Sequence, residues 1–128
     1  MDTGLIVSIL RANVPTLELA YLFGSQFAGT ATDNSDVDVA IRAGSRLAFD
    51  ERVRIAGALS DGLKKEVDLV DLWDANDTVK MQVIDKGGLL HAASPQRVAE
   101  FEMYALSDYI RLNELRRGIL EDFYSGGS

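Results

Sequence analysis

Two aspartates near the end of the first third of the chain carry the clearest chemical pattern. Asp36 and Asp38 lie in the run DVDVAI, where acidic and apolar residues alternate as they do in a strand. Side chains two positions apart on a strand point to the same face, so we expect the two carboxylates to converge. Like charges that close repel each other and raise a pKa unless a cation lies between them. The pair therefore predicts a site for a hard divalent cation such as Mg²⁺, which favours carboxylates together with phosphate oxygens and water.

A third aspartate, Asp68, lies in the run VDLVDL, which also reads as a strand. If that strand lies beside the one that carries Asp36 and Asp38, the three carboxylates form one cluster. Three carboxylates can hold two metal ions about 3.5–4 Å apart, the arrangement that supports in-line phosphoryl displacement. One carboxylate could also take the proton of an acceptor hydroxyl. We therefore expect catalytic and metal-binding roles for Asp36, Asp38 and Asp68.

A possible phosphate-binding bend precedes this cluster. The apolar run LELAYLF ends at Gly24-Ser25, where the chain must turn sharply. Glycine lets the backbone approach phosphate oxygens without a Cβ clash, and N–H groups at a following helix start would point at those oxygens. The Ser25 hydroxyl adds a donor. We expect Gly24 and Ser25 to bind phosphate oxygens.

The combined pattern resembles a known family. The segment GSQFAGTATDNSDVDVA, with ten residues between Ser25 and Asp36, looks like the signature of the DNA polymerase β-type nucleotidyltransferase superfamily and of its minimal branch. Within that branch it is similar to the MntA antitoxins, which are paired with HEPN-domain toxins of the HepT kind. The likeness covers nearly the whole chain, from the strand at 17–25 through 67–71 to the run IDKGGLL at 84–90.

The resemblance implies roles for the residues that match the motif. Gly24 and Ser25 would hold the phosphates, Asp36 and Asp38 would bind Mg²⁺, and Asp68 would act as base or second-metal ligand. Members of this branch transfer AMP from ATP to a tyrosine of the toxin and so silence it.

One departure from the family pattern stands between the two motifs. Many relatives carry an arginine shortly before the glycine that matches Gly29, and this chain has Ala28 there. The change removes one possible phosphate contact. It leaves the metal ligands untouched.

Hydrophobic periodicity and turn residues predict the elements that must position these side chains. We expect a helix from Leu5 to Val14, strands 17–23, 36–41 and 67–72, helices 49–65 and 78–86, an edge strand 89–91 and a helix from about Pro95 to Tyr124. The predicted fold class is α/β, a nucleotidyltransferase fold. Its small mixed β-sheet is flanked by helices, which we expect on one side, and it ends in a long C-terminal helix. Residues 1–124 would form the single domain, and 125–128 a disordered tail.

The C-terminal helix is long for a domain of this size. Apolar residues recur every three or four positions along about 30 residues, which corresponds to about 45 Å. We expect its distal half to pack on another subunit and to make the protein a hetero-oligomer. The alternative is that the helix wraps around its own core.

Composition bounds the possible partners. The chain has 20 acidic and 13 basic residues, a net charge of −7, and no Lys/Arg stripe typical of a nucleic-acid binder. This balance fits cation binding or docking onto a basic protein, and it equally fits simple solubility. The chain contains no cysteine, no apolar run of about 18 residues and no basic, signal-like N-terminus, so we expect a cytoplasmic protein without a membrane span.

Other candidate residues have ordinary structural interpretations. Asp71 would face away from Asp68 as a solvated acid, and His91, the only histidine, would be structural. Trp73 and Phe49 would pack in the core, with stacking on an adenine as the alternative. One of four arginines could neutralise a phosphate, without a sequence criterion to choose among Arg42, Arg46, Arg52 and Arg54. Tyr104 and Tyr109 would be core or interface residues.

The leading hypothesis is an Mg²⁺-dependent nucleotidyltransferase that uses ATP and modifies a HEPN-domain toxin. A binding-only antitoxin with an idle nucleotide site is the main alternative. A third hypothesis is a small-molecule acceptor, as in the aminoglycoside-modifying relatives; those usually carry an additional substrate domain, for which we expect no room in 128 residues. A phosphatase with an Asp-x-Asp nucleophile would not explain Gly24-Ser25 at this spacing.

Overall fold

The computed structural model describes residues 2–24 and 36–126, with side chains described as far as residue 118. Its elements are α1 (Thr3–Asn13), β1 (Leu19–Phe23), β2 (Val37–Arg42), α3 (Phe49–Leu63), β3 (Val67–Asp71), α4 (Asp77–Lys86), β4 (Gly88–Ala92) and α5 (Pro95–Gly126). Each expected helix and strand is confirmed in type, and the observed ends differ by a few residues. The α5 helix continues through Gly126, which is two residues into the expected tail, and residues 127–128 lie outside the described residues.

The four strands described form one mixed sheet in the order β3-β2-β1-β4. β1 pairs antiparallel with β2 and with β4, whereas β2 pairs parallel with β3. The predicted small mixed sheet is confirmed, and β1 and β2 are its central strands. The sheet therefore brings the end of β1 next to the beginnings of β2 and β3.

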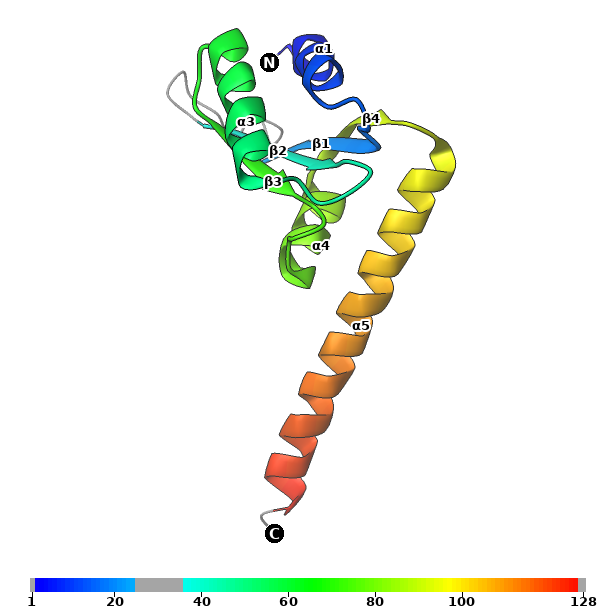
Figure 1. Cartoon of the computed structure of the whole chain (residues 1–128). Coiled ribbons are helices and arrows are strands. Elements are labelled where there is room, and N and C mark those ends of the chain that lie inside the picture. Colours follow the sequence, from blue (N-terminus) through cyan, green and yellow to red (C-terminus); the bar gives the residue numbers. More distant parts are fainter. Residues whose placement is uncertain (1, 25–35, 127–128) are drawn as a thin grey trace.

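Helices cover both faces of this sheet, so the expectation of helices on one side is wrong. α1 and α3 pack on one face, and α4 and the first half of α5 pack on the other (Figure 1). The cause lies in β1, whose alternate residues are apolar on both faces. Ala20 and Leu22 join the α1/α3 core, while Leu19 and Tyr21 join the core under α4 and α5. A strand buried on both sides reads as a continuous apolar run, which does not reveal how many layers cover it.

The α5 helix leaves the sheet after its first turns and extends well past α4 (Figure 1). Its 32 residues correspond to a length of about 48 Å. Near its beginning, Phe101 and Ala105 are buried, and Glu102 accepts a hydrogen bond of 3.0 Å from the Tyr21 hydroxyl. Although α5 is long, none of the described helices is apolar enough over a sufficient length to span a membrane.

Candidate functional site

The three predicted aspartates lie on the same face and at the same end of the sheet. The parallel pairing of β2 with β3 sets Asp38 directly opposite Asp68, and Val37 opposite Val67. Residues that are paired in register point to the same side, and Asp36 lies directly before β2, two positions before Asp38. The face is the one that α4 covers further along, because Ala40 and Val70, the next residues with this orientation, pack in the α4/α5 core. The expected juxtaposition of Asp68 with the aspartate pair is thus present.

Charge repulsion within this cluster affects Asp38 most. Burial raises the pKa of the Asp38 carboxyl above its usual value, and the negative charges of Asp68 and then Asp36 raise it further. Asp36 and Asp68 themselves are exposed. The cluster is open: among the described residues, no three acidic, histidine or cysteine side chains stand close enough together to form a ready-made metal site. The three carboxylates are therefore close enough for their charges to raise the pKa of Asp38, but too far apart to bind one metal ion together in this arrangement.

Gly24 closes the cluster from the side of β1. It follows Phe23, which is paired with Asp38 in the antiparallel ladder, and its φ of +74° lies in the left-handed region. A Cβ at position 24 would overlap Oδ2 of Asp38 and lie 3.1 Å from its Cγ. Glycine is therefore required on two grounds, the backbone conformation and the contact with the carboxylate. Ser25, the other half of the expected phosphate-binding bend, lies outside the described residues, as do Ala28 and Gly29.

The residues at this end of the sheet fit a divalent cation such as Mg²⁺. The donors are carboxylate oxygens, which are the hard ligands that Mg²⁺ prefers. A cation would also remove the repulsion that raises the pKa of Asp38. Because residue 24 has no side chain, a phosphate could approach the carboxylates along the backbone at Gly24.

A hollow of about 360 Å³ adjoins this bend. It is lined by Phe23 and Gly24 from β1 and by Gln82 and Lys86 from α4. Gln82 and Lys86 are four positions apart, so they lie on the same side of α4. Neither residue was predicted from the sequence. The sequence predicted an edge strand shortly after Lys86, but it did not predict that this strand pairs with β1 and so brings the end of α4 to the end of β1.

The four arginines considered for phosphate binding are engaged elsewhere. Arg42 stacks over the Trp73 ring at 4.2 Å and pairs with Glu18 at 3.4 Å. Arg46 and Arg52 both pair with Asp74, and Arg54 donates to Asn13. Arg42 also lies four residues beyond Asp38 on β2, about 13 Å along the strand. None of the four lines the hollow beside Gly24.

Asp71 is not the solvated acid that the sequence suggested. Only 1% of its surface is exposed, and its two carboxylate oxygens accept hydrogen bonds from the backbone N–H groups of Leu47 and Trp73, at 2.8 and 3.0 Å. It faces away from Asp68, as expected, but toward a buried loop rather than toward water. Asp71 therefore holds the connection between β2 and α3.

The two aromatic residues considered for adenine stacking differ from the expected core packing. Trp73 is partly exposed, and its indole N–H donates to the Ala43 carbonyl at 2.8 Å. Phe49 begins α3 and is 81% exposed. Neither lines the hollow beside Gly24, where Phe23 is the aromatic neighbour.

Comparison with known proteins places this geometry in context. Residues 5–96 match the family described as polymerase beta, nucleotidyltransferase. The protein adenylyltransferase MntA of Shewanella oneidensis is 38% identical to this chain over 122 residues, which make up 95% of this chain and 87% of that protein.

Solved structures of high similarity come from toxin–antitoxin complexes. One chain of a crystal structure of a toxin–antitoxin with AMP-PNP is 35% identical and superposes with a TM-score of 0.86, covering 97% of this chain and 99% of that one. A second match comes from the structure of the tri-AMPylated Shewanella oneidensis HEPN toxin in complex with MNT antitoxin. There the identity is 33%, the TM-score is 0.77, and the match covers 95% of each chain.

Proposed function

The chain belongs to the polymerase beta nucleotidyltransferase family, and we propose that it is an antitoxin that transfers AMP from ATP to a tyrosine of a HEPN-domain toxin. The observation that carries this proposal is the contact of Gly24 with Asp38, which is itself paired with Asp68. The similarity to a protein adenylyltransferase supports the reaction class, and the complex of a related antitoxin with an AMPylated HEPN toxin supports the acceptor.

The chain's own residues divide the chemistry between them. Asp36 and Asp38 would hold Mg²⁺, with Asp68 as a further ligand or as base, and the Gly24-Ser25 backbone would receive the phosphates. When bound, the metal ion supplies positive charge for the phosphates and the departing pyrophosphate. Asp68 is exposed and next to Asp38, so its carboxylate can accept the proton of the tyrosine hydroxyl. The tyrosine oxygen then forms a bond to the α-phosphorus of ATP as the bond to pyrophosphate breaks.

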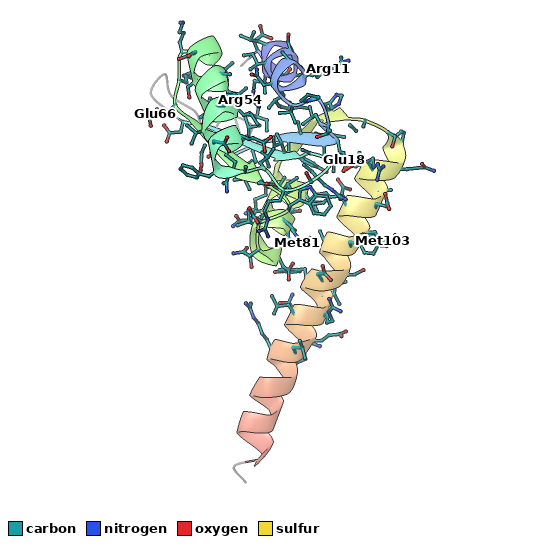
Figure 2. All side chains as sticks on the ribbon, in the orientation of Figure 1. Arg11, Glu18, Arg54, Glu66, Met81 and Met103 are labelled. Atoms are coloured by element: carbon teal, nitrogen blue, oxygen red, sulfur yellow. The ribbon has the colours of Figure 1, made fainter. Side chains whose placement is uncertain are left out.

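The exposed side of α5 supplies a docking surface for the toxin. Large apolar side chains that remain exposed follow one another along the helix: Met103, Tyr104, Leu106, Ile110 and Leu115. Figure 2 shows Met103 on α5 and Met81 on the neighbouring α4. These side chains stay exposed in the described chain, and a HEPN toxin would cover them to form a hetero-oligomer.

A variant of the docking surface tests this contact. Leu106→Asp combined with Ile110→Asp should weaken the complex with the toxin at least tenfold, while nucleotide binding stays unchanged. Ser107→Asp combined with Asn113→Asp, which adds the same two negative charges to the same helix at exposed polar positions, is the matched control. Unchanged toxin affinity in the double variant would remove α5 from the interface.

The cellular setting follows from the substrates. ATP, Mg²⁺ and an intracellular toxin act together in the cytoplasm, and the absence of cysteine is compatible with that compartment. A net charge of −7 disfavours binding to the phosphate backbone of a nucleic acid, so we expect no nucleic acid as a direct partner.

A labelling experiment separates transfer from mere binding. The chain and its toxin are incubated with Mg²⁺ and ATP that is labelled on the α- or the γ-phosphate. The proposal predicts that only the α-label becomes covalently attached to the toxin. The variant with Asp36→Ala and Asp38→Ala should form the complex but attach no label. If that variant still neutralises the toxin fully in cells, binding alone is sufficient and the nucleotide site is idle.

A further inference from the structure

The cation that completes the nucleotide site is absent from the motifs of the sequence. We propose that Lys86 binds the phosphate chain of ATP from the side opposite the carboxylates. This inference rests on the proposed function and names a residue of the same site. Among the residues that line the hollow beside Gly24, Lys86 is the one with a positive charge.

Backbone packing fixes the position of Lys86. The next residue, Gly87, lies against the end of β1 so tightly that a Cβ there would overlap the Val83 carbonyl oxygen and lie 3.2 Å from the Leu22 carbonyl oxygen. Gly88 then pairs with Leu22 in the sheet. Lys86, the last residue of α4, is thus two positions from a residue that pairs with Leu22, which itself lies two positions before Gly24. The sheet therefore fixes the backbone of Lys86 near the Gly24 bend.

Electrostatics requires a cation at this place. A triphosphate that enters the hollow meets the field of Asp36, Asp38 and Asp68 in a chain whose net charge is −7. A metal ion offsets part of this repulsion on the carboxylate side, and an ammonium group on the α4 side offsets it from the other direction. Within the described part of the chain, Lys86 forms no ion pair or hydrogen bond, so its charge is available to a ligand.

A simpler role for Lys86 concerns its own helix. A lysine in the last turn interacts favourably with the helix carbonyl groups, and any helix gains from this. That role does not explain why the side chain borders a hollow at the Gly24 bend. The two roles make different predictions, because only phosphate binding changes the affinity for a nucleotide.

The same helix offers a matched control. Lys80 precedes Lys86 by six positions and borders a different hollow of about 310 Å³, which is lined by Arg42, Trp73, Phe101 and Tyr104 among others. This hollow lies at the far end of β2 from Asp38. Lys80→Ala therefore removes the same charge from α4 without touching the proposed phosphate contact.

The experiment measures binding of AMP-PNP to the full chain by calorimetry in the presence of Mg²⁺, without toxin. Lys86→Ala should weaken binding about tenfold or more, as expected for the loss of one charge-assisted contact to phosphate. Lys86→Arg should stay within about threefold of the wild type, and Lys80→Ala should bind like the wild type. Raising the ionic strength should weaken the wild type more than Lys86→Ala, because the lost contact is the one that salt screens. Equal melting temperatures show that the variants are folded.

Three outcomes of the AMP-PNP binding experiment would overturn the role of Lys86. Equal affinity of the wild type and Lys86→Ala overturns the role of Lys86 while leaving the proposed function intact. Equal weakening by Lys80→Ala means that general charge, and not a contact, is responsible. If the wild type does not bind AMP-PNP at all, the proposed function fails together with this inference.

Discussion

Gly24 and Asp38 are in such close contact that the Asp38 carboxylate occupies the space in which a side chain at position 24 would lie. The bend that ends β1 and the carboxylate on β2 therefore form one geometric unit. The register of the sheet extends this unit to Asp68 on β3. A substitution that shifts the end of β1, or the beginning of β2 or β3, should therefore also displace the other two.

Gly24→Ala tests this unit directly. The substitution adds a Cβ that overlaps Asp38 and imposes a φ of +74° on a residue that disfavours it. We expect a loss of stability of about 1–3 kcal/mol, measured by urea denaturation, and at least a tenfold loss of AMP transfer. Gly57→Ala is the control, since a Cβ there meets nothing within 4 Å on the surface of α3; it should stabilise the fold by roughly 0.5–1 kcal/mol. Full activity of Gly24→Ala would show that the bend does not shape the site.

Asp38→Asn should abolish transfer and yet stabilise the metal-free protein. Because burial, Asp68 and Asp36 raise the pKa of Asp38, the folded state binds protons more tightly than the unfolded state. Wild-type stability therefore falls as the pH rises from about 3.9 through the raised pKa, and the variant escapes this loss. At pH 7 the gain should be on the order of 0.5 kcal/mol in urea denaturation with a chelator present.

Two controls accompany this measurement. Asp85→Asn removes an exposed carboxylate from α4 and should not reproduce the pH-dependent gain. Added Mg²⁺ should stabilise the wild type and not Asp38→Asn. If Asp38→Asn is less stable than the wild type at every pH, the Asp38 carboxylate makes favourable contacts in the folded state and is not destabilised by its acidic neighbours.

Asp71→Asn should destabilise the fold without altering the site directly. An amide keeps one acceptor oxygen, so one of the two backbone N–H groups, of Leu47 or Trp73, loses its partner in a buried position. The expected cost is about 1–3 kcal/mol in chemical denaturation. Asp74→Asn, which removes only partly exposed ion pairs with Arg46 and Arg52, should cost below about 1 kcal/mol. Equal effects of the two variants would contradict a special role for Asp71.

Tyr21→Phe should loosen the attachment of α5 to the sheet. The variant loses the hydrogen bond from Tyr21 to Glu102, at an expected cost of about 1 kcal/mol at pH 7. Burial and the carboxylate of Glu102 raise the pKa of Tyr21, so the stability that the hydroxyl contributes is fully present below the unfolded-state pKa of about 10 and is lost as the pH rises from there toward the raised pKa. The cost of Tyr21→Phe should therefore shrink at higher pH, and a double-mutant cycle with Glu102→Gln should reveal coupling. Additive effects in that cycle would show that the two residues act independently.

The local signals of the sequence predicted the elements and the acidic cluster well. Alternation in the segments that carry Asp36, Asp38 and Asp68 reflects the two-residue period of a strand, which also decides which face each carboxylate occupies. Gly24 stood out because a bend after an apolar strand needs it. The catalytic, metal-binding and nucleotide-binding roles of Gly24, Asp36, Asp38 and Asp68 stay predictions, as does the role of Ser25, which lies outside the described part of the chain.

Features that depend on long-range packing were not predictable in the same way. The helices cover both faces because β1 is apolar on both sides, a pattern that gives no count of layers. Asp71 is buried because a loop 24 residues earlier in the chain supplies one of its donors, the N–H of Leu47. Lys86 reaches the site through the pairing of β4 with β1, which no motif encodes.

The most direct test of the account is the intact mass of the purified HEPN toxin after incubation with this protein, ATP and Mg²⁺. We expect a mass increase in whole AMP units, on a tyrosine of the toxin, that disappears when Asp36 and Asp38 are both replaced by alanine. An unchanged toxin mass, with the toxin bound and neutralised, would contradict it.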